Sequence, residues 1–397
     1  MTTTFWSRGF LGIISLIIVI FIALVSNKPP DVKWLLIIFG VSLLISNLLG
    51  AFTAVLMAFE RFAAFGILSC FYGFAFPVLG VVSLHMGFGL LGIGISQLTV
   101  SITVTAIGIG YVNWKVLKPI TGFNKSEIWQ ALKTAAPLGI TMLLTAVYYK
   151  ADFVMLSYLR SDIELGYYNS AYTVVNTLLL FATTFSGTLL PRLSNLMASD
   201  RENLDRLYRT VFKYLLFIGL GFAFGTLIVA KPLFELVFGS RYLPGAGALT
   251  ILIWASALIF VNSLQSQLLI AADKKKEMLI ITATATFINI ALNLFLIPIF
   301  GIIGAAVTTV IAELVNGVWS FLILRDHNSS KDLFKVSPKI LISALVMIGI
   351  LLLLPNIHVV FRIFIGAIAY IISLVIVGGF ERAELKGIRD IFRIGTV

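Results

Sequence analysis

The feature that most constrains the fold of this chain is a series of apolar segments of roughly 20 residues, the length at which a helix crosses the hydrocarbon of a bilayer. Such segments follow one another along almost the whole sequence, with short connections between them. Because lipid offers the backbone no hydrogen-bond partner, the segments must be helices. We therefore predict an all-α polytopic membrane protein of about twelve spans. The expected spans are 9–26, 34–58, 66–86, 89–113, 131–157, 165–190, 212–230, 247–271, 278–299, 301–324, 339–355 and 360–380.

The composition excludes most other classes of protein. Of the 397 residues 59% are hydrophobic and only 12% are charged, about half the charged fraction of a soluble domain. No stretch between the spans is long enough to fold as a separate soluble domain. The first span follows Arg8 as in a signal peptide, but the apolar run is long and no clear cleavage motif follows it, so we expect a retained helix. A single cysteine, Cys70, rules out a disulfide framework.

The distribution of basic residues predicts the orientation of the spans. Of the 29 Lys and Arg residues, 22 lie in the loops on the side of the amino terminus and seven lie on the opposite side. This bias predicts that both termini are cytoplasmic, in the inner or plasma membrane. The formal charge of +11 then has anionic membrane lipids as its expected partner. We expect no nucleic-acid binding, because no surface domain carries the charge.

The sequence contains an internal repeat with an offset of 212 residues, which aligns spans two to four with spans eight to ten. The clearest anchor is the match of Gly89 and Gly92 with Gly301 and Gly304. Each pair begins a span after an outward turn, where glycine permits a tight turn and close helix packing. Spans five and six have no upstream counterpart. The pattern predicts two related helical lobes, of four and six helices, around a cavity.

A run of motifs opens the second lobe. Asp152 lies late in one helix, Gly166-Tyr167-Tyr168-Asn169-Ser170-Ala171-Tyr172 opens the next, and Leu190-Pro191-Arg192-Leu193-Ser194 closes it. This pattern resembles the carboxy-terminal lobe of Wzx-type polysaccharide flippases, which belong to the MOP exporter superfamily. The likeness covers residues 10–325 and continues in a further helix pair, as in 14-helix members.

The resemblance implies a two-lobed MOP/MATE-like flippase for cell-surface polysaccharide biosynthesis. It would move an isoprenoid pyrophosphate-linked oligosaccharide from the inner to the outer leaflet by alternating access. A proton or sodium ion would be its coupling ion, and polysaccharide polymerase machinery would be its protein partner. No cofactor is implied. The sequence departs from the family in the amino-terminal lobe, where four helices stand in place of six. The chain is therefore either truncated or misassigned at its start, or a shortened relative.

The expected organisation has five parts, which follow the lobes and the connections between them. They are an incomplete amino-terminal lobe (1–114), a cytoplasmic linker (115–130), a carboxy-terminal lobe (131–325), an extra helix pair (326–380) and a basic cytoplasmic tail (381–397).

Charged side chains inside the spans are the first candidates for function, because they are costly in hydrocarbon and usually mark a transport path. Lys150 is expected to attract pyrophosphate or acidic sugars, and Asp152 to bind the coupling cation or to balance an arginine of the cavity. Glu313, midway through span ten, is the second candidate for ion coupling. Structural alternatives remain open: Lys150 and Asp152 can reach the interface by snorkelling, and a protonated Glu313 can bond to Asn289 or Asn293 of span nine.

Polar residues supply the remaining candidates. Asn169 and Asn176 can present amides to sugar hydroxyls, although amides also join helices. Arg61 and Arg192 lie in cytoplasmic loops and can receive pyrophosphate through paired hydrogen bonds, although topology alone places basic residues there. The tyrosines between 148 and 172 can stack on sugar rings, but we expect them to form an interfacial belt.

Three other readings compete with the flippase. A membrane enzyme acting on lipid-linked sugars needs acids, bases or metal ligands on a sizeable outward loop. The longest outward loop, 231–246, holds only Glu235 as a carboxylate and no histidine, so we expect no catalysis and no bound metal. A MATE-like cation-coupled exporter differs from the flippase only in its substrate. A non-transporting truncated relative is the third alternative.

Overall fold

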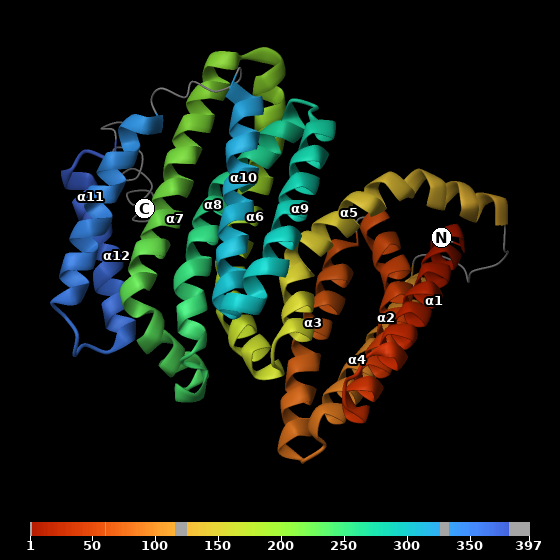
Figure 1. The fold of residues 1–397 in the computed structure, drawn as a ribbon. Coiled ribbons are helices and arrows are strands. Elements are labelled where there is room, and N and C mark those ends of the chain that lie inside the picture. Colours follow the sequence, from red (N-terminus) through yellow and green to blue (C-terminus); the bar gives the residue numbers. More distant parts are fainter. Residues whose placement is uncertain (1, 60, 116–124, 326–332, 381–397) are drawn as a thin grey trace, which may run out of the picture. The chain divides into compact units, whose positions relative to one another are not determined.

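The computed structural model describes residues 2–59, 61–115, 125–325 and 333–380. Within these ranges the chain is all helical, and an α-helix lies at each position where a span was predicted (Figure 1). The helices are α1 (Thr2–Val25), α2 (Pro30–Ala58), α3 (Phe62–His85), α4 (Gly89–Lys115), α5 (Lys125–Leu159), α6 (Asp162–Ser199), α7 (Arg201–Phe238), η1 (Ser240–Tyr242), α8 (Gly245–Ala271), α9 (Lys275–Phe300), α10 (Ile302–Leu324), α11 (Leu333–Leu352) and α12 (Val359–Ile376).

Ten of the described helices are long and apolar enough to cross a membrane. The remaining two predicted spans correspond to α5 and to α11, whose apolar part is the shorter segment Pro338–Leu352. The chain is therefore a multi-pass membrane protein. Most of the predicted linker and the whole basic tail lie outside the described residues.

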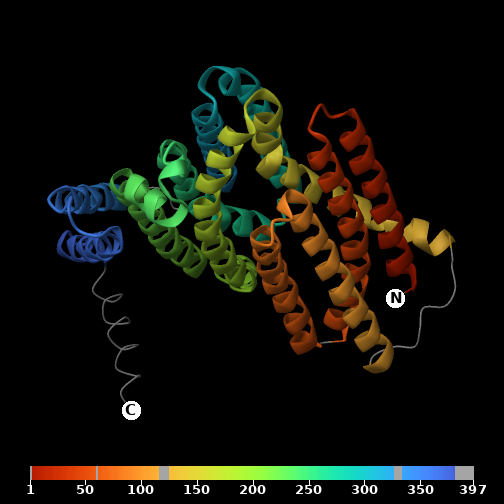
Figure 2. The same ribbon diagram turned by 90° about the horizontal axis from the view of Figure 1, so that it is seen from below.

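Two compact units make up the chain, Met1–Ile140 and Thr141–Val397, which we call unit 1 and unit 2. In unit 1, α2 packs against α1 and α4, and α4 packs against α3. In unit 2, α8 packs against α7 and α10 in the same way, and α10 packs against α9. The same order of packing in α1–α4 and α7–α10 supports the repeat that the sequence predicts. Unit 2 adds α6 against α8 and the α11–α12 pair against α7 (Figure 2).

The matched glycines adopt the same backbone conformation in both units. Gly89 and Gly301 each have a φ of +57°, in the left-handed region that glycine adopts without steric cost. A Cβ atom at Gly92 would lie 2.6 Å from Cβ of Phe88, and one at Gly304 would lie 2.6 Å from the carbonyl carbon of Leu296. The prediction of a tight turn followed by close packing is confirmed in both copies.

Helices α6 and α7 form a hairpin that is longer than a membrane span. Each has 38 residues, or about 57 Å at 1.5 Å per residue, against roughly 30 Å of hydrocarbon. Ser161 caps α6 by accepting a hydrogen bond from the backbone N–H of Glu164 (3.2 Å), and Asp200 caps α7 by accepting one from that of Asn203 (3.1 Å). The hydrogen bonds from Asn203 hold the pKa of Asp200 below its usual range.

Candidate functional site

The second half of α5 carries Lys150 and Asp152, and their side chains have different surroundings. Asp152 is only 3% exposed. Its Oδ2 accepts a hydrogen bond from the Tyr168 hydroxyl, and its Oδ1 accepts one from the backbone N–H of Phe153 at 3.1 Å. Lys150 is exposed, and its Nζ lies 4.8 Å from the centre of the Phe153 ring. Residues two apart on a helix do not share a face, so the structure separates the cation from the carboxyl group.

Glu313 is the second enclosed carboxyl group of unit 2, at 2% exposure on α10. The Tyr148 hydroxyl donates to its Oε1 at 2.7 Å. The Asn262 amide donates to its Oε2 at 2.8 Å and to its backbone carbonyl at 3.0 Å. Helices α5, α8 and α10 thus meet at this side chain. Within the described residues, neither Glu313 nor Asp152 has a basic side chain within ion-pair distance.

The interhelical partner proposed from the sequence for Glu313 was wrong. Asn289 and Asn293 lie on α9 and are buried, but the Asn293 amide donates to Oδ1 of Asn289 at 3.0 Å. The Thr308 hydroxyl donates to Oδ1 of Asn293 at 2.5 Å. This cluster therefore joins α9 to α10 through its own hydrogen bonds.

The tyrosines also differ from expectation. Tyr148, Tyr168 and Tyr172 are 7%, 0% and 4% exposed, so these three form no interfacial belt. The hydroxyls of Tyr148 and Tyr168 instead bind the two carboxyl groups. Tyr158 is 63% exposed. No sequence pattern signals the tyrosine–carboxyl pairs directly, because they join residues on different helices.

The other predicted site residues do not join the enclosed cluster. Asn169 and Asn176 on α6 are exposed, as are Arg192 near the end of α6 and Arg61 before α3. In the part of the chain that the structure describes, no group of three or more His, Cys, Asp or Glu side chains could hold a metal ion.

Comparison with known proteins identifies the family of the chain. The profile of a family described as "Polysaccharide biosynthesis protein" matches residues 1–247. The chain belongs to this family. The probable low-salt glycan biosynthesis flippase Agl15 of Haloferax volcanii is 24% identical over 219 residues, 54% of this chain and 46% of that protein. The capsular polysaccharide biosynthesis protein CapF of Staphylococcus aureus is 25% identical over 182 residues, 45% of this chain and 46% of that protein. The chain thus aligns with about half the length of these relatives.

Two solved structures of other membrane transporters share the fold of the chain. The inward closed conformation of the lipid II flippase MurJ has a TM-score of 0.81 at 18% identity, covering 94% of this chain and 82% of that chain. The inward-facing conformation of a multidrug resistance MATE family transporter has a TM-score of 0.64 at 16% identity, covering 81% of this chain and 80% of that chain. At these identities the likeness concerns the fold.

Proposed function

We propose that this protein flips an isoprenoid pyrophosphate-linked oligosaccharide from the inner to the outer leaflet of the cell membrane by alternating access. The family match and the names of the glycan-related relatives support the substrate class. The observation that carries the transport mechanism is the pair of carboxyl groups, Asp152 and Glu313, enclosed in a membrane bundle and each bound by a tyrosine hydroxyl. Both termini are cytoplasmic in this proposal, as the distribution of Lys and Arg predicts.

Asp152 and Glu313 are the proposed ion-coupling residues. An ionised carboxylate is costly inside a bilayer unless it is paired, hydrogen-bonded or neutralised. The two groups have hydrogen-bond donors but no cation within ion-pair distance among the described residues. A carboxylate has about four lone-pair sites, and Glu313 uses one on each oxygen for Tyr148 and Asn262. The remaining lone pairs can take a proton or a sodium ion, which would neutralise the site.

The exposed residues of α5 and α6 are the proposed substrate contacts. Lys150 would attract the pyrophosphate, and Asn169 and Asn176 would bond to sugar hydroxyls. Arg61 and Arg192 would receive the pyrophosphate at the inner entrance through paired hydrogen bonds. Because Lys150 and Asp152 are two residues apart on one helix, binding of an anion at the first changes the electrostatic field at the second.

Complementation tests this proposal. A strain that lacks its lipid-linked glycan flippase is supplied with this chain, and surface glycan is measured alongside membrane insertion. We expect export to be restored, and Asp152→Asn, Glu313→Gln and Lys150→Gln to reduce export without loss of protein. An inserted chain that restores no export would reject this substrate. Resistance to cationic drugs without glycan export would favour the MATE-like alternative, which shares the fold.

A further inference from the structure

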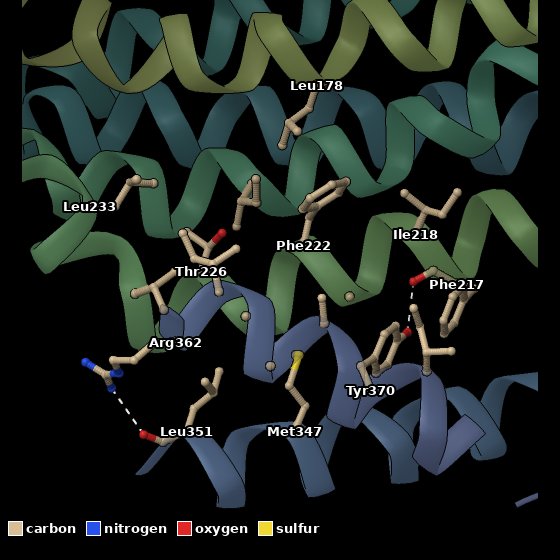
Figure 3. A pocket seen from close by; sticks show the side chains of 18 of the residues that line it. Leu178, Phe217, Ile218, Phe222, Thr226, Leu233, Met347, Leu351, Arg362 and Tyr370 are labelled. Carbon is tan, nitrogen blue, oxygen red and sulfur yellow. Dashed lines mark hydrogen bonds between the residues drawn. The ribbon is translucent and has the colours of Figure 1, made fainter. Parts of the chain in front are cut away.

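An apolar groove runs along α7 on the side where the α11–α12 pair packs (Figure 3). Its volume is about 360 Å³. The α7 wall extends from Phe217 to Leu233, about 24 Å of helix, and Met347, Leu351 and residues 363–371 supply the opposite side. Gly225 widens the groove, since a Cβ atom there would lie 3.6 Å from Cε of Met347. Such walls suit a hydrocarbon chain and not a sugar.

One charged residue, Arg362 at the start of α12, lines this groove. Its side chain is buried, with the residue 9% exposed. One Nη donates to the carbonyl of Leu351 at 3.2 Å, whereas Nε has no hydrogen-bond partner among the described residues. Figure 3 shows the guanidinium at one end of the groove and Tyr370 near the other, where its hydroxyl donates to the carbonyl of Phe217. A buried arginine with an unused donor calls for an anion, because a guanidinium has five N–H donors and no acceptor.

We infer that this groove is a binding site for an anionic phospholipid, with one acyl chain along α7 and the phosphate on Arg362. The volume has room for on the order of ten methylene-sized groups at about 30 Å³ each, which is most of one acyl chain. Guanidinium pairs with phosphate through directed hydrogen bonds. No carboxylate is among the described residues that line the groove, so none of them attracts the ammonium group of a zwitterionic lipid. The bound lipid would join α7 to the α11–α12 pair, and this role is independent of the proposed substrate.

Native mass spectrometry of the full chain in detergent, titrated with phosphatidylglycerol, tests the inference. We expect Arg362→Gln to weaken binding of the first lipid roughly tenfold, the scale of one charge-assisted hydrogen bond. Gly225→Leu keeps the arginine but fills the groove, and it should weaken binding as well. Arg241→Gln is the matched control, because Arg241 is an exposed arginine in η1 outside the groove. The affinity of this variant for phosphatidylglycerol should equal that of the wild type. Arg362→Lys keeps a cation at the site and serves as a second variant if Arg362→Gln does not fold.

Four results would overturn the inference. Equal affinity in the wild type, Arg362→Gln and Gly225→Leu would mean that Arg362 only binds the end of α11. Equal binding of phosphatidylcholine would remove the preference for an anionic headgroup. Displacement of phosphatidylglycerol by an equimolar polyprenyl phosphate would assign the groove to an isoprenoid lipid. Competition by millimolar inorganic phosphate would reduce the site to one for free anions.

Discussion

The two units share an order of helix packing but differ in the chemistry of their interiors. Glu313 of unit 2 has Ser101 as its counterpart 212 residues earlier in unit 1, and both are buried. Ser101 lies 3.4 Å from the hydroxyl of Ser46, a neutral contact. One turn after Glu313 is Gly317, where a Cβ atom would lie 2.6 Å from Oδ1 of Asn262. The counterpart of Gly317 is Thr105.

This difference shows how one helix arrangement can be neutral in one copy and ionisable in the other. The missing side chain at Gly317 leaves room for the Asn262 amide, and that amide binds Glu313. The larger Thr105 occupies the matching position in unit 1, where its hydroxyl reaches the carbonyl of Ile45 at 3.4 Å. We therefore place the proposed coupling site in unit 2.

The largest effect is expected for Ser101→Glu, which gives unit 1 a carboxyl group without counterparts of Tyr148 and Asn262. Ser101 instead contacts Ser46, whose hydroxyl lies 3.4 Å from that of Tyr72. We expect destabilisation of several kcal/mol, on the scale of about 3–5 kcal/mol for an uncompensated buried charge. Thermal unfolding of the purified protein in detergent measures it. Ser101→Ala is the control and should have a small effect. Equal melting temperatures for the two variants would show that position 101 does not resemble position 313.

A second substitution makes unit 2 resemble unit 1. Gly317→Thr should push the Asn262 amide away from Glu313 and leave a buried carboxyl oxygen without its donor. The expected loss of stability is about 1–3 kcal/mol, measured by the same unfolding assay. The reciprocal change, Thr105→Gly, leaves no buried carboxyl group without a donor and should cost about 1–2 kcal/mol, from the helix propensity of glycine and the lost contact with the carbonyl of Ile45. A larger effect at position 105 than at 317 would contradict the assigned role of Gly317.

Gly92 and Gly304, which follow the matched turns of the two units, allow a comparison with a smaller expected loss of stability. Gly304→Ala should destabilise the protein by about 1–3 kcal/mol, because the new Cβ meets the backbone carbonyl group of Leu296. Gly92→Ala should cost less, since its Cβ meets Cβ of Phe88 and the Ser83 side chain, whose hydroxyl can rotate away, whereas the Cβ at Gly304 meets backbone atoms only. Unfolding curves of the two variants decide the order. If Gly92→Ala were the more harmful change, the close approach in unit 2 would not be the tighter one.

The smallest expected effect concerns the α6–α7 hairpin, to which α1–α4 offer no counterpart. The pKa of Asp200 is lowered in the folded state by its hydrogen bonds from Asn203. Its contribution to stability is therefore present above the unfolded pKa of about 3.9 and is lost as the pH falls through the lower folded value. The protection factors of residues 196–207, which correct for the slower intrinsic exchange in acid, should fall between pH 5 and pH 3, and Asp200→Asn should remove that dependence. Unchanged protection factors over this pH range would refute the capping role.

Much of the fold was predictable from the sequence, because every segment that crosses lipid must be an apolar helix of roughly 20 residues. The lengths of the apolar segments predicted the helices, and Gly89 and Gly301 predicted the turns. The structure confirms both. Hydropathy cannot show that α6 and α7 continue well beyond the bilayer, since their polar ends obey no such rule.

The site was predictable only in part. Asp152 and Glu313 are conspicuous in apolar helices and were identified as candidates. Their partners were not, because a hydrogen bond between helices depends on how the helices rotate and pack, which periodicity does not give. For the same reason Tyr148 and Tyr168 were expected at an interface, although the structure buries them against carboxyl groups.

We propose that the carboxyl group of Glu313 couples an ion to glycan-lipid movement. The most direct measurement is the flipping rate of a fluorescent lipid-linked oligosaccharide in vesicles containing the purified chain, with and without an imposed proton or sodium gradient. We predict that one of the two gradients accelerates flipping roughly tenfold, a factor within the range typical of coupling between two sites. Glu313→Gln should lose this response, whereas Ser101→Ala should keep it. A gradient response that survives in Glu313→Gln would show that Glu313 does not couple the ion.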